Sequence, residues 1–210
     1  MRVEDIISNV QIYGFEDSVK GSKYPMAVDL SAVDSEVTPR TVKLAQAERG
    51  SGHDNFLNGV IVQFDLTFTN KAWVEAERYH FLDFVSSQST MHRITKFDLD
   101  KAYISYTDPR IIAIMKEKTK DYNELQADIK RLGEEGKDTT TLRDLSNQKY
   151  LEILYSNPAG FRLTARMTTN YRQLKTIYAQ RRTHRLPEWQ AFCDWIETLP
   201  NAEFITKQGE

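Results

Sequence analysis

The sequence predicts an α+β fold in which helices outweigh strands. One stretch, 59–69, has the composition of a strand, and a much longer stretch, 109–155, has the apolar spacing of helices. Further helix signals appear from residue 170 to the C-terminus. The 210 residues are enough for one sizeable core, or at most two small ones.

The N-terminal third contains one predicted helix and one predicted strand. Residues 1–37 mix turn formers with short apolar patches, so we expect an irregular region there. A helix is expected over about 40–49, following a proline and ending at the glycines of 50–52. The strand at 59–69 is rich in β-branched and aromatic residues, with partial polar alternation. A helix over 70–80 is expected next, because an asparagine stands at its N-cap position.

The middle of the chain is charged and strongly helical. Apolar residues at helical spacing run from Pro109 to about Tyr155, and Gly133 and Gly136 mark a turn between two helices. We interpret this stretch as a helical hairpin that ends at Pro158. A solvated pair of helices without chemistry is the favoured interpretation of such a composition, and a docking surface for a partner is the alternative.

The C-terminal part predicts a short connection and two helices. Residues 161–167 alternate polar and apolar side chains, which indicates either a short strand or an extended link. Asn170 is then a good N-cap for a helix to about residue 182, and a last helix is expected over 188–199 after Pro187.

The first of these helices is cationic. Arginines, a lysine and a histidine gather between Arg172 and Arg185. We expect Leu174 and Ile177 on its apolar face and the cations, including Lys175, largely elsewhere. Guanidinium forks hold phosphates well, although charge alone favours a solvated cationic face.

Bulk composition excludes several functional classes. The net charge of −2 argues against a nucleic-acid coat protein, and no apolar run is long enough to cross a bilayer. The N-terminus has no signal-peptide pattern, and the single Cys193 suits a reducing cytoplasm, so a cytoplasmic protein is expected. The histidines lack zinc-ligand spacing, so no metal site is expected. Phosphate-loop, dinucleotide and serine-hydrolase motifs are absent from the sequence.

The order of residue types in the cationic helix resembles flavin-dependent thymidylate synthases. That family carries an Asn-x-Arg-x-Leu block at a helix start, an arginine nine residues after the first, and then a tryptophan. Five residues match in order: Asn170, Arg172, Leu174, Arg181 and Trp189. The resemblance implies that Asn170 and Arg172 contact the flavin, together with Thr176, which stands where the family often has asparagine. It also implies that Arg181 is catalytic and pairs with the base or sugar of the nucleotide.

A second block, nearer the N-terminus, has the family's parts in the same order. Residues 52–55 resemble its His-Glu-Thr-Pro turn, and 78–81 stand at its Arg-His-Arg signature. The resemblance implies further cofactor contacts from the turn and the signature: His53, Asn55, Arg78 and His80. It implies substrate contacts from the segment that follows: Ser86, Ser87, Gln88, Ser89, Thr90 and Arg93.

The signature fits in two registers. Placing Arg78 on the family's first arginine requires one inserted residue before the serines, whereas placing His80 on the family's histidine requires none. The second register puts Tyr79 and Phe81 where both arginines belong, and neither register retains the signature's second arginine. Either Arg93 or Arg162 is a candidate replacement, and a less anionic ligand or a different nucleotide suits a site with fewer arginines.

The resemblance implies a flavin-dependent thymidylate synthase-like fold: one domain over 1–210, with a central antiparallel sheet flanked by helices and a charged hairpin at 110–156. The implied activity is reductive methylation, or a related C5 alkylation, of dUMP with FAD, NADPH and methylenetetrahydrofolate. The implied assembly is a homotetramer with sites between subunits, binding a pyrimidine nucleotide but no nucleic-acid polymer and no membrane. The alternatives are a nucleotide-binding descendant without flavin chemistry, and a structural or interaction protein.

Overall fold

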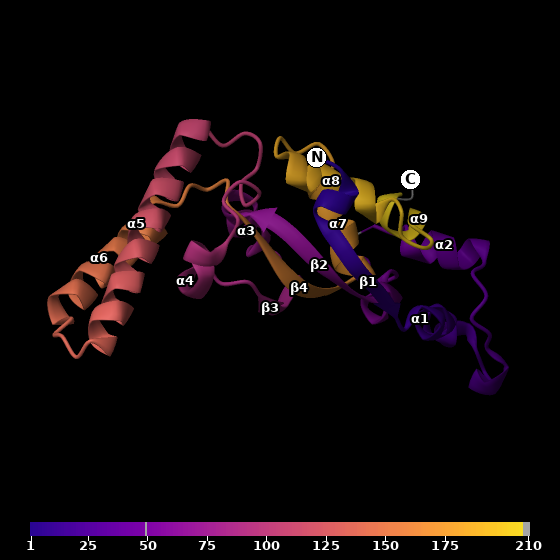
Figure 1. Ribbon diagram of the computed structural model, residues 1–210. Coiled ribbons are helices and arrows are strands. Elements are labelled where there is room, and N and C mark those ends of the chain that lie inside the picture. Colours follow the sequence, from indigo (N-terminus) through magenta and orange to yellow (C-terminus); the bar gives the residue numbers. More distant parts are fainter. Residues whose placement is uncertain (49, 208–210) are drawn as a thin grey trace. The chain divides into compact units, whose positions relative to one another are not determined.

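The computed structural model describes residues 1–48 and 50–207 and contains a four-stranded antiparallel sheet (Figure 1). The strands are β1 (Ile7–Tyr13), β2 (Ile61–Thr69), β3 (Asp83–Ser87) and β4 (Arg162–Asn170), in the order β1-β2-β4-β3. The α-helices are α1 (Phe15–Ser22), α2 (Pro39–Ala45), α3 (Asn70–Ala76), α4 (Thr90–Arg93), α5 (Pro109–Glu134), α6 (Thr140–Ser156), α7 (Tyr171–Arg181), α8 (Pro187–Ile196) and α9 (Glu203–Thr206). The predicted α+β class with a central antiparallel sheet is confirmed.

The described residues form two compact units. The first comprises residues of 1–68, of 72–87 and from 164 onward, and it holds most of the sheet together with α1, α2, α7, α8 and α9. The second comprises 69–71 and 88–163, and it holds α4, α5 and α6. Among the described residues, no helix is both long enough and apolar enough to cross a membrane.

The core of the first unit is built on β2. Its side chains alternate between buried and half-buried, as the sequence pattern predicted, because successive residues of a strand point to opposite faces. The buried Phe64 ring lies 4.5 Å from that of Trp195, and the Phe68 ring lies 4.9 Å from that of Trp189. These aromatic pairs fix α8 against one face of the sheet.

The N-terminal region is irregular only outside residues 7–22, so the prediction of irregular structure over 1–37 is wrong for that part. It forms the edge strand β1 and the helix α1, and β1 pairs antiparallel with β2. The pairing register shifts between Ser8 and Gln11, where Asn9 has a φ of 50°. The turn into α1 requires Gly14, whose φ is 69° and where an added Cβ would lie 2.6 Å from the carbonyl oxygen of Gly59.

Ser86 and Ser87, which the resemblance implies as substrate contacts, end strand β3. This strand pairs antiparallel with β4, and all of its residues are exposed. Its register shifts between Phe84 and Ser86. An edge strand without a buried face has no apolar alternation, which explains why the sequence pattern missed it.

The second unit contains the predicted helical hairpin. Helices α5 and α6 lie side by side, joined by the expected turn at Gly136, which has a φ of 70° (Figure 1). The core of this unit includes Met115 and Ile153, both with no exposed surface, and Phe161. Ion pairs such as Lys118–Glu152, at 3.2 Å, join the outer surfaces of the two helices.

The other predicted elements are confirmed with shifted boundaries. Helix α2 ends at Ala45, and the predicted last residue, Arg49, lies outside the described residues. Helix α3 stops at Ala76, four residues before the predicted end. The predicted strand alternative at 161–167 is correct, since β4 occupies this stretch, and α8 begins at Pro187 as expected but is followed by α9.

Candidate functional site

The candidate site lies in the first unit, where β4 passes into α7. Asn170 caps the helix, because its Oδ1 accepts a hydrogen bond of 2.8 Å from the backbone N–H of Gln173. The next residue, Tyr171, is fully buried and donates its hydroxyl to the carbonyl of Pro200 at 2.8 Å. Its backbone N–H also bonds to the carbonyl of Val60. The first turn of α7 is therefore held rigidly.

A pocket of about 210 Å³ opens beside this turn. Seven residues line it: Gly50, Asn58, Phe81, Asn170, Arg172, Gln173 and Thr176. The lining offers one guanidinium, three side-chain amides and one hydroxyl. Three of the predicted cofactor residues, Asn170, Arg172 and Thr176, are thus brought together.

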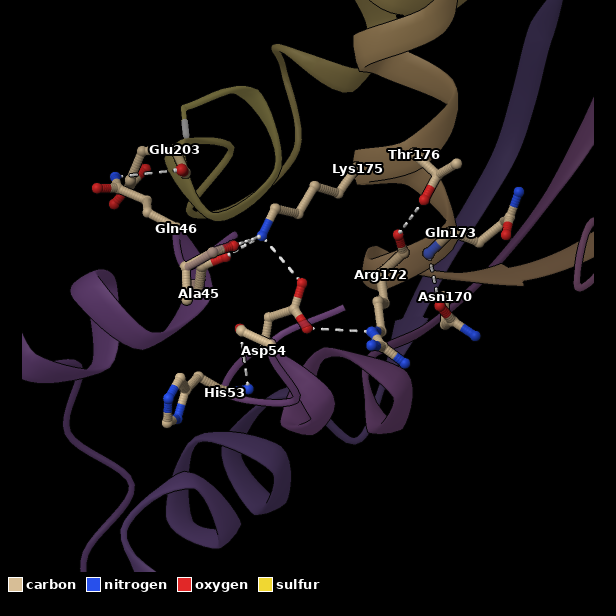
Figure 2. A network of polar contacts seen from close by, with 12 residues as sticks. Ala45, Gln46, His53, Asp54, Asn170, Arg172, Gln173, Lys175, Thr176 and Glu203 are labelled. Atoms are coloured by element: carbon tan, nitrogen blue, oxygen red, sulfur yellow. Dashed lines mark hydrogen bonds and ion pairs between the residues drawn. The ribbon is translucent and has the colours of Figure 1, made fainter. Parts of the chain in front are cut away.

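A buried carboxylate determines the position of the guanidinium. Asp54 has no exposed side-chain surface, and its Oδ1 accepts a hydrogen bond of 3.1 Å from Nε of Arg172 (Figure 2). Its Oδ2 accepts from Nζ of Lys175 at 2.9 Å. The same Nζ donates to the carbonyls of Ala45 and Ala47, at 2.7 Å each. The buried ammonium therefore uses all three of its donors.

The burial of Lys175 contradicts the prediction that this residue lies away from the apolar face of the helix. Its side chain has no exposed surface, because the buried stripe of α7 runs through Tyr171, Leu174, Lys175 and Ile177. Lys175 follows Tyr171 by four residues, a spacing that places both on one face of a helix. The charge is tolerated there because Asp54 and two carbonyls surround it.

Arg172 is thereby held at the pocket. Its Nε is bound to Asp54, and among the described residues no hydrogen bond occupies Nη1 or Nη2. The side chain is 34% exposed. It therefore presents one edge of a guanidinium fork, an edge suited to an anionic or carbonyl oxygen.

Arg181 lies in a separate and more enclosed cluster. Its Nη1 pairs with Oε2 of Glu75 at 2.8 Å, and its Nε donates to the hydroxyl of Tyr79 at 2.7 Å. The guanidinium lies over the ring of Trp189, 4.8 Å from its centroid. Glu75 also accepts from Nε1 of Trp189 at 3.2 Å and lies 3.3 Å from Nε2 of His184. Most of the charge on the predicted catalytic arginine is thus balanced within the protein.

A second, wider pocket of about 560 Å³ lies beside the signature segment. Its lining comes from one continuous stretch: Glu77, Tyr79, His80, Phe81, Leu82, Asp83 and Phe84. His80, a predicted cofactor residue, lines this pocket and not the one that contains Arg172. Phe81 lines both.

The remaining predicted residues lie outside the described linings of these two pockets. His53, Asn55 and Arg78 are exposed, and Figure 2 shows the ring of His53 directed away from Asp54 and its partners. Ser86 and Ser87 are exposed on β3. The others belong to the second unit, where they precede or form the short helix α4: Gln88, Ser89, Thr90 and Arg93. No group of three or more potential metal ligands occurs in the described part of the chain.

Sequence reasoning missed several residues of the site. The sequence places Asp54 in a turn, and no pattern in it indicates that this residue is fully buried. Lys175 had a detectable signal, the four-residue spacing from Tyr171. Glu75 had none, since nothing in a single sequence links it to Arg181, 106 positions away.

Two solved structures of the flavin-dependent thymidylate synthase ThyX from Helicobacter pylori, both with FAD and dUMP, are similar to this chain. The TM-scores are 0.63 and 0.61, each at 14% sequence identity, and each match covers 95% of this chain and 97% of the other. A scan against models of protein families finds no match, and a search of curated protein sequences finds none either. The likeness in structure extends over nearly the whole of both chains, and the protein therefore has the ThyX fold.

Proposed function

We propose that this protein is a flavin-dependent enzyme that methylates a pyrimidine nucleotide reductively at C5, with dUMP as the first candidate substrate. FAD, NADPH and methylenetetrahydrofolate are the proposed cofactor and co-substrates. The observation that carries the proposal is the pocket at the start of α7, in which Asn170, Arg172 and Thr176 converge within a ThyX fold.

The residues of this pocket suit one edge of a flavin. A guanidinium edge and the amides of Asn170 and Gln173 match a conjugated ring that carries carbonyl oxygens and delocalised negative charge. The volume of about 210 Å³ is below the roughly 300–1,000 Å³ of pockets for drug-sized ligands, so it suits part of FAD rather than the whole molecule. When bound and reduced by NADPH, FAD would supply the hydride. Arg172 would stabilise negative charge on the ring through its fixed position.

For the nucleotide, we propose the wider pocket beside Tyr79 and His80. Tyr79 accepts a hydrogen bond from Arg181, so the predicted catalytic arginine contacts one residue of this lining. The pairing of Arg181 with Glu75 leaves little uncompensated charge, which favours recognition of the base over recognition of a phosphate. We further propose a homotetramer in which neighbouring subunits complete each site, and sedimentation equilibrium would test that mass.

The decisive experiment follows flavin binding and turnover in the same preparation. The purified protein is titrated with FAD, and the visible flavin bands of the protein fraction are recorded after gel filtration. Formation of dTMP from dUMP is then measured with NADPH and methylenetetrahydrofolate. Binding together with turnover supports the proposal.

Two arginine substitutions give the test and its control: Arg172 lies in the first turn of α7, and Arg182 directly follows the last residue of the helix. Arg172→Ala is expected to weaken FAD binding by roughly 10- to 150-fold, because a hydrogen bond to a charged group contributes about 1.5–3 kcal/mol. Arg182→Ala, at an exposed position paired with Asp194, should leave binding unchanged. A protein that is stabilised by dUMP but takes up no FAD would instead be the nucleotide-binding descendant without flavin chemistry.

A further inference from the structure

Phe81 adopts a backbone conformation that its side chain does not favour. Its φ is 63°, in the left-handed region. The other described non-glycine residues with positive φ are Asn9 and Asn201, and asparagine tolerates this region far better than a bulky aromatic residue does. Such strain persists only where the surrounding structure imposes it, and it concentrates at functional sites.

Core packing does not explain the conformation. The Phe81 side chain is 65% exposed, and no ring contact of Phe81 occurs among the described residues. Phe84, three residues later, provides a contrast, because its ring packs against Trp73 with centroids 5.0 Å apart. Phe81 is therefore both strained and exposed, and no ring packing in the ligand-free protein offsets the cost of the strain.

The position of Phe81 is informative. It contributes to the lining of both the 210 Å³ pocket and the 560 Å³ pocket, so the two pockets adjoin at this residue. In the smaller pocket it shares the lining with Arg172 and Asn170. The lining thus combines an aromatic ring with a cationic and an amide edge.

We propose that Phe81 is a stacking platform for a planar heteroaromatic ring of the ligand. The ring face would lie on Phe81, and the polar ring edge would meet Arg172 and Asn170. This inference rests on the proposed function, because it takes the smaller pocket as the ligand site. A flavin ring and a pyrimidine base share this chemistry, so the test includes both.

Two leucine substitutions test the stacking directly. Phe81→Leu keeps an apolar side chain but removes the flat face, and it should weaken binding of FAD and of riboflavin by at least about 5-fold, the lower end of what base–aromatic stacking contributes. Tyr155→Leu is the matched control, since Tyr155 is an exposed aromatic residue that lines neither pocket, and it should bind both flavins like the unmodified protein. Phe81→Tyr should retain the affinity.

Phe81→Gly distinguishes an effect on flavin binding from an effect on the stability of the fold. Glycine adopts a φ of 63° without strain, so the midpoint of thermal unfolding should stay level or rise while flavin affinity falls. Phe81→Trp gives a spectroscopic signature, because an indole stacked on a flavin quenches its fluorescence by electron transfer. A purely structural role for Phe81 predicts neither result.

The outcomes separate this inference from the proposed function. If the unmodified protein binds FAD and the leucine and glycine variants at Phe81 bind it equally well, the stacking role is wrong and the flavin proposal stands. If the protein binds dUMP but no flavin, the same variants are titrated with dUMP, and a loss of at least about 5-fold retains Phe81 as a platform for a pyrimidine base. If neither FAD, riboflavin nor dUMP binds, both proposals are overturned.

Discussion

Two carboxylates direct the cations of α7. Asp54 holds Arg172 and Lys175, and Glu75 holds Arg181. Only Arg182, at the end of the helix, has the solvated ion pairs that its charge suggests. The number of positive residues in α7 therefore overstates its cationic surface, and the helix presents one guanidinium edge, that of Arg172, in a fixed position at the pocket.

Replacing Asp54 tests the buried network. Asp54→Asn leaves the ammonium of Lys175 in the core without a counter-ion, and breaking a buried pair in this way costs about 3–5 kcal/mol. Urea unfolding should show a loss of this size. Asp194→Asn is the matched control, because its ion pair with Arg182 is exposed and should contribute less than about 1 kcal/mol.

A double substitution identifies the cause of that loss. Asp54→Asn with Lys175→Met removes both buried charges, and an apolar replacement of a buried pair is often close to neutral. We therefore expect the double variant to be more stable than Asp54→Asn alone. A further decrease in the free energy of unfolding would show that the carbonyl contacts of Lys175, and not its charge balance, dominate.

Cys193 should be chemically inert in the folded protein. It is fully buried in α8, and burial raises the pKa of its thiol from 9.0 to about 12. At any pH below 9 the reactive thiolate is then about 1,000-fold scarcer than for an ordinary cysteine. Ellman's reagent at pH 8 should react only as fast as the protein opens, and rapidly in urea. Fast labelling of the native protein would contradict this burial.

The thiol also makes stability depend on pH. Its folded pKa is raised, so its contribution is complete below about pH 9 and is lost as the pH rises toward 12, because only the unfolded state then releases the proton. The free energy of unfolding, measured between pH 8 and 10, should begin to fall as the pH rises, and the fall should be smaller in Cys193→Ala. An equal slope in the variant would assign the decline to other groups.

The sequence predicts those helices and strands that have a buried face. Strand β2 and helices α5 and α6 were found because their apolar spacing reports which side packs. The sequence does not predict strands β1 and β3, because nearly all of their residues are exposed and they therefore lack the alternation of apolar and polar residues that marks a half-buried strand. Pairing between distant strands, not local preference, stabilises them.

In the candidate site, too, the sequence predicts the features that depend on neighbouring residues and not those that depend on distant ones. Asn170 was identifiable because capping is local and depends on residue type. The approach of Asp54 to α7 joins residues 118 positions apart, and the strained φ of Phe81 is set by the surrounding fold. Neither is encoded in a short stretch of sequence, so both became visible only in three dimensions.

The N-cap of α7 separates helix stability from ligand binding. Asn170→Ala should cost about 0.5–2 kcal/mol, the usual loss at an N-cap position. Asn170→Ser keeps a capping oxygen and most of that stability, but it removes the amide that lines the pocket. We expect urea unfolding to resemble that of the unmodified protein, whereas FAD affinity should fall. If Asn170→Ser binds FAD normally, Asn170 acts only as a cap.

At the scale of the whole molecule, each unit has its own hydrophobic core. The aromatic rings between β2 and α8 form that of the first unit. Met115, Ile153 and Phe161 belong to that of the second. A core substitution should therefore act first on the unit that contains it, since cooperative opening follows contiguous packing.

Ile153→Ala tests this expectation. The side chain is fully buried between the helices of the second unit, and such a truncation costs about 2–5 kcal/mol. Hydrogen exchange should speed up throughout α5 and α6 and much less in β2 and α8. Ile114→Ala, at a position that is 50% exposed, is the control and should change little. A uniform loss of protection over the whole chain would indicate one cooperative unit.

The irregular outer strands have a consequence for how the protein behaves when it is concentrated. An open sheet edge is a template on which strands from other molecules add, and straight, regular edges are the most hazardous. Here β1 is broken by the register shift at Asn9, and β3 is short and shifts register as well. Strand-by-strand growth into fibrils is thus discouraged at both ends of the sheet, even though exposed Phe84 and Val85 would otherwise favour it.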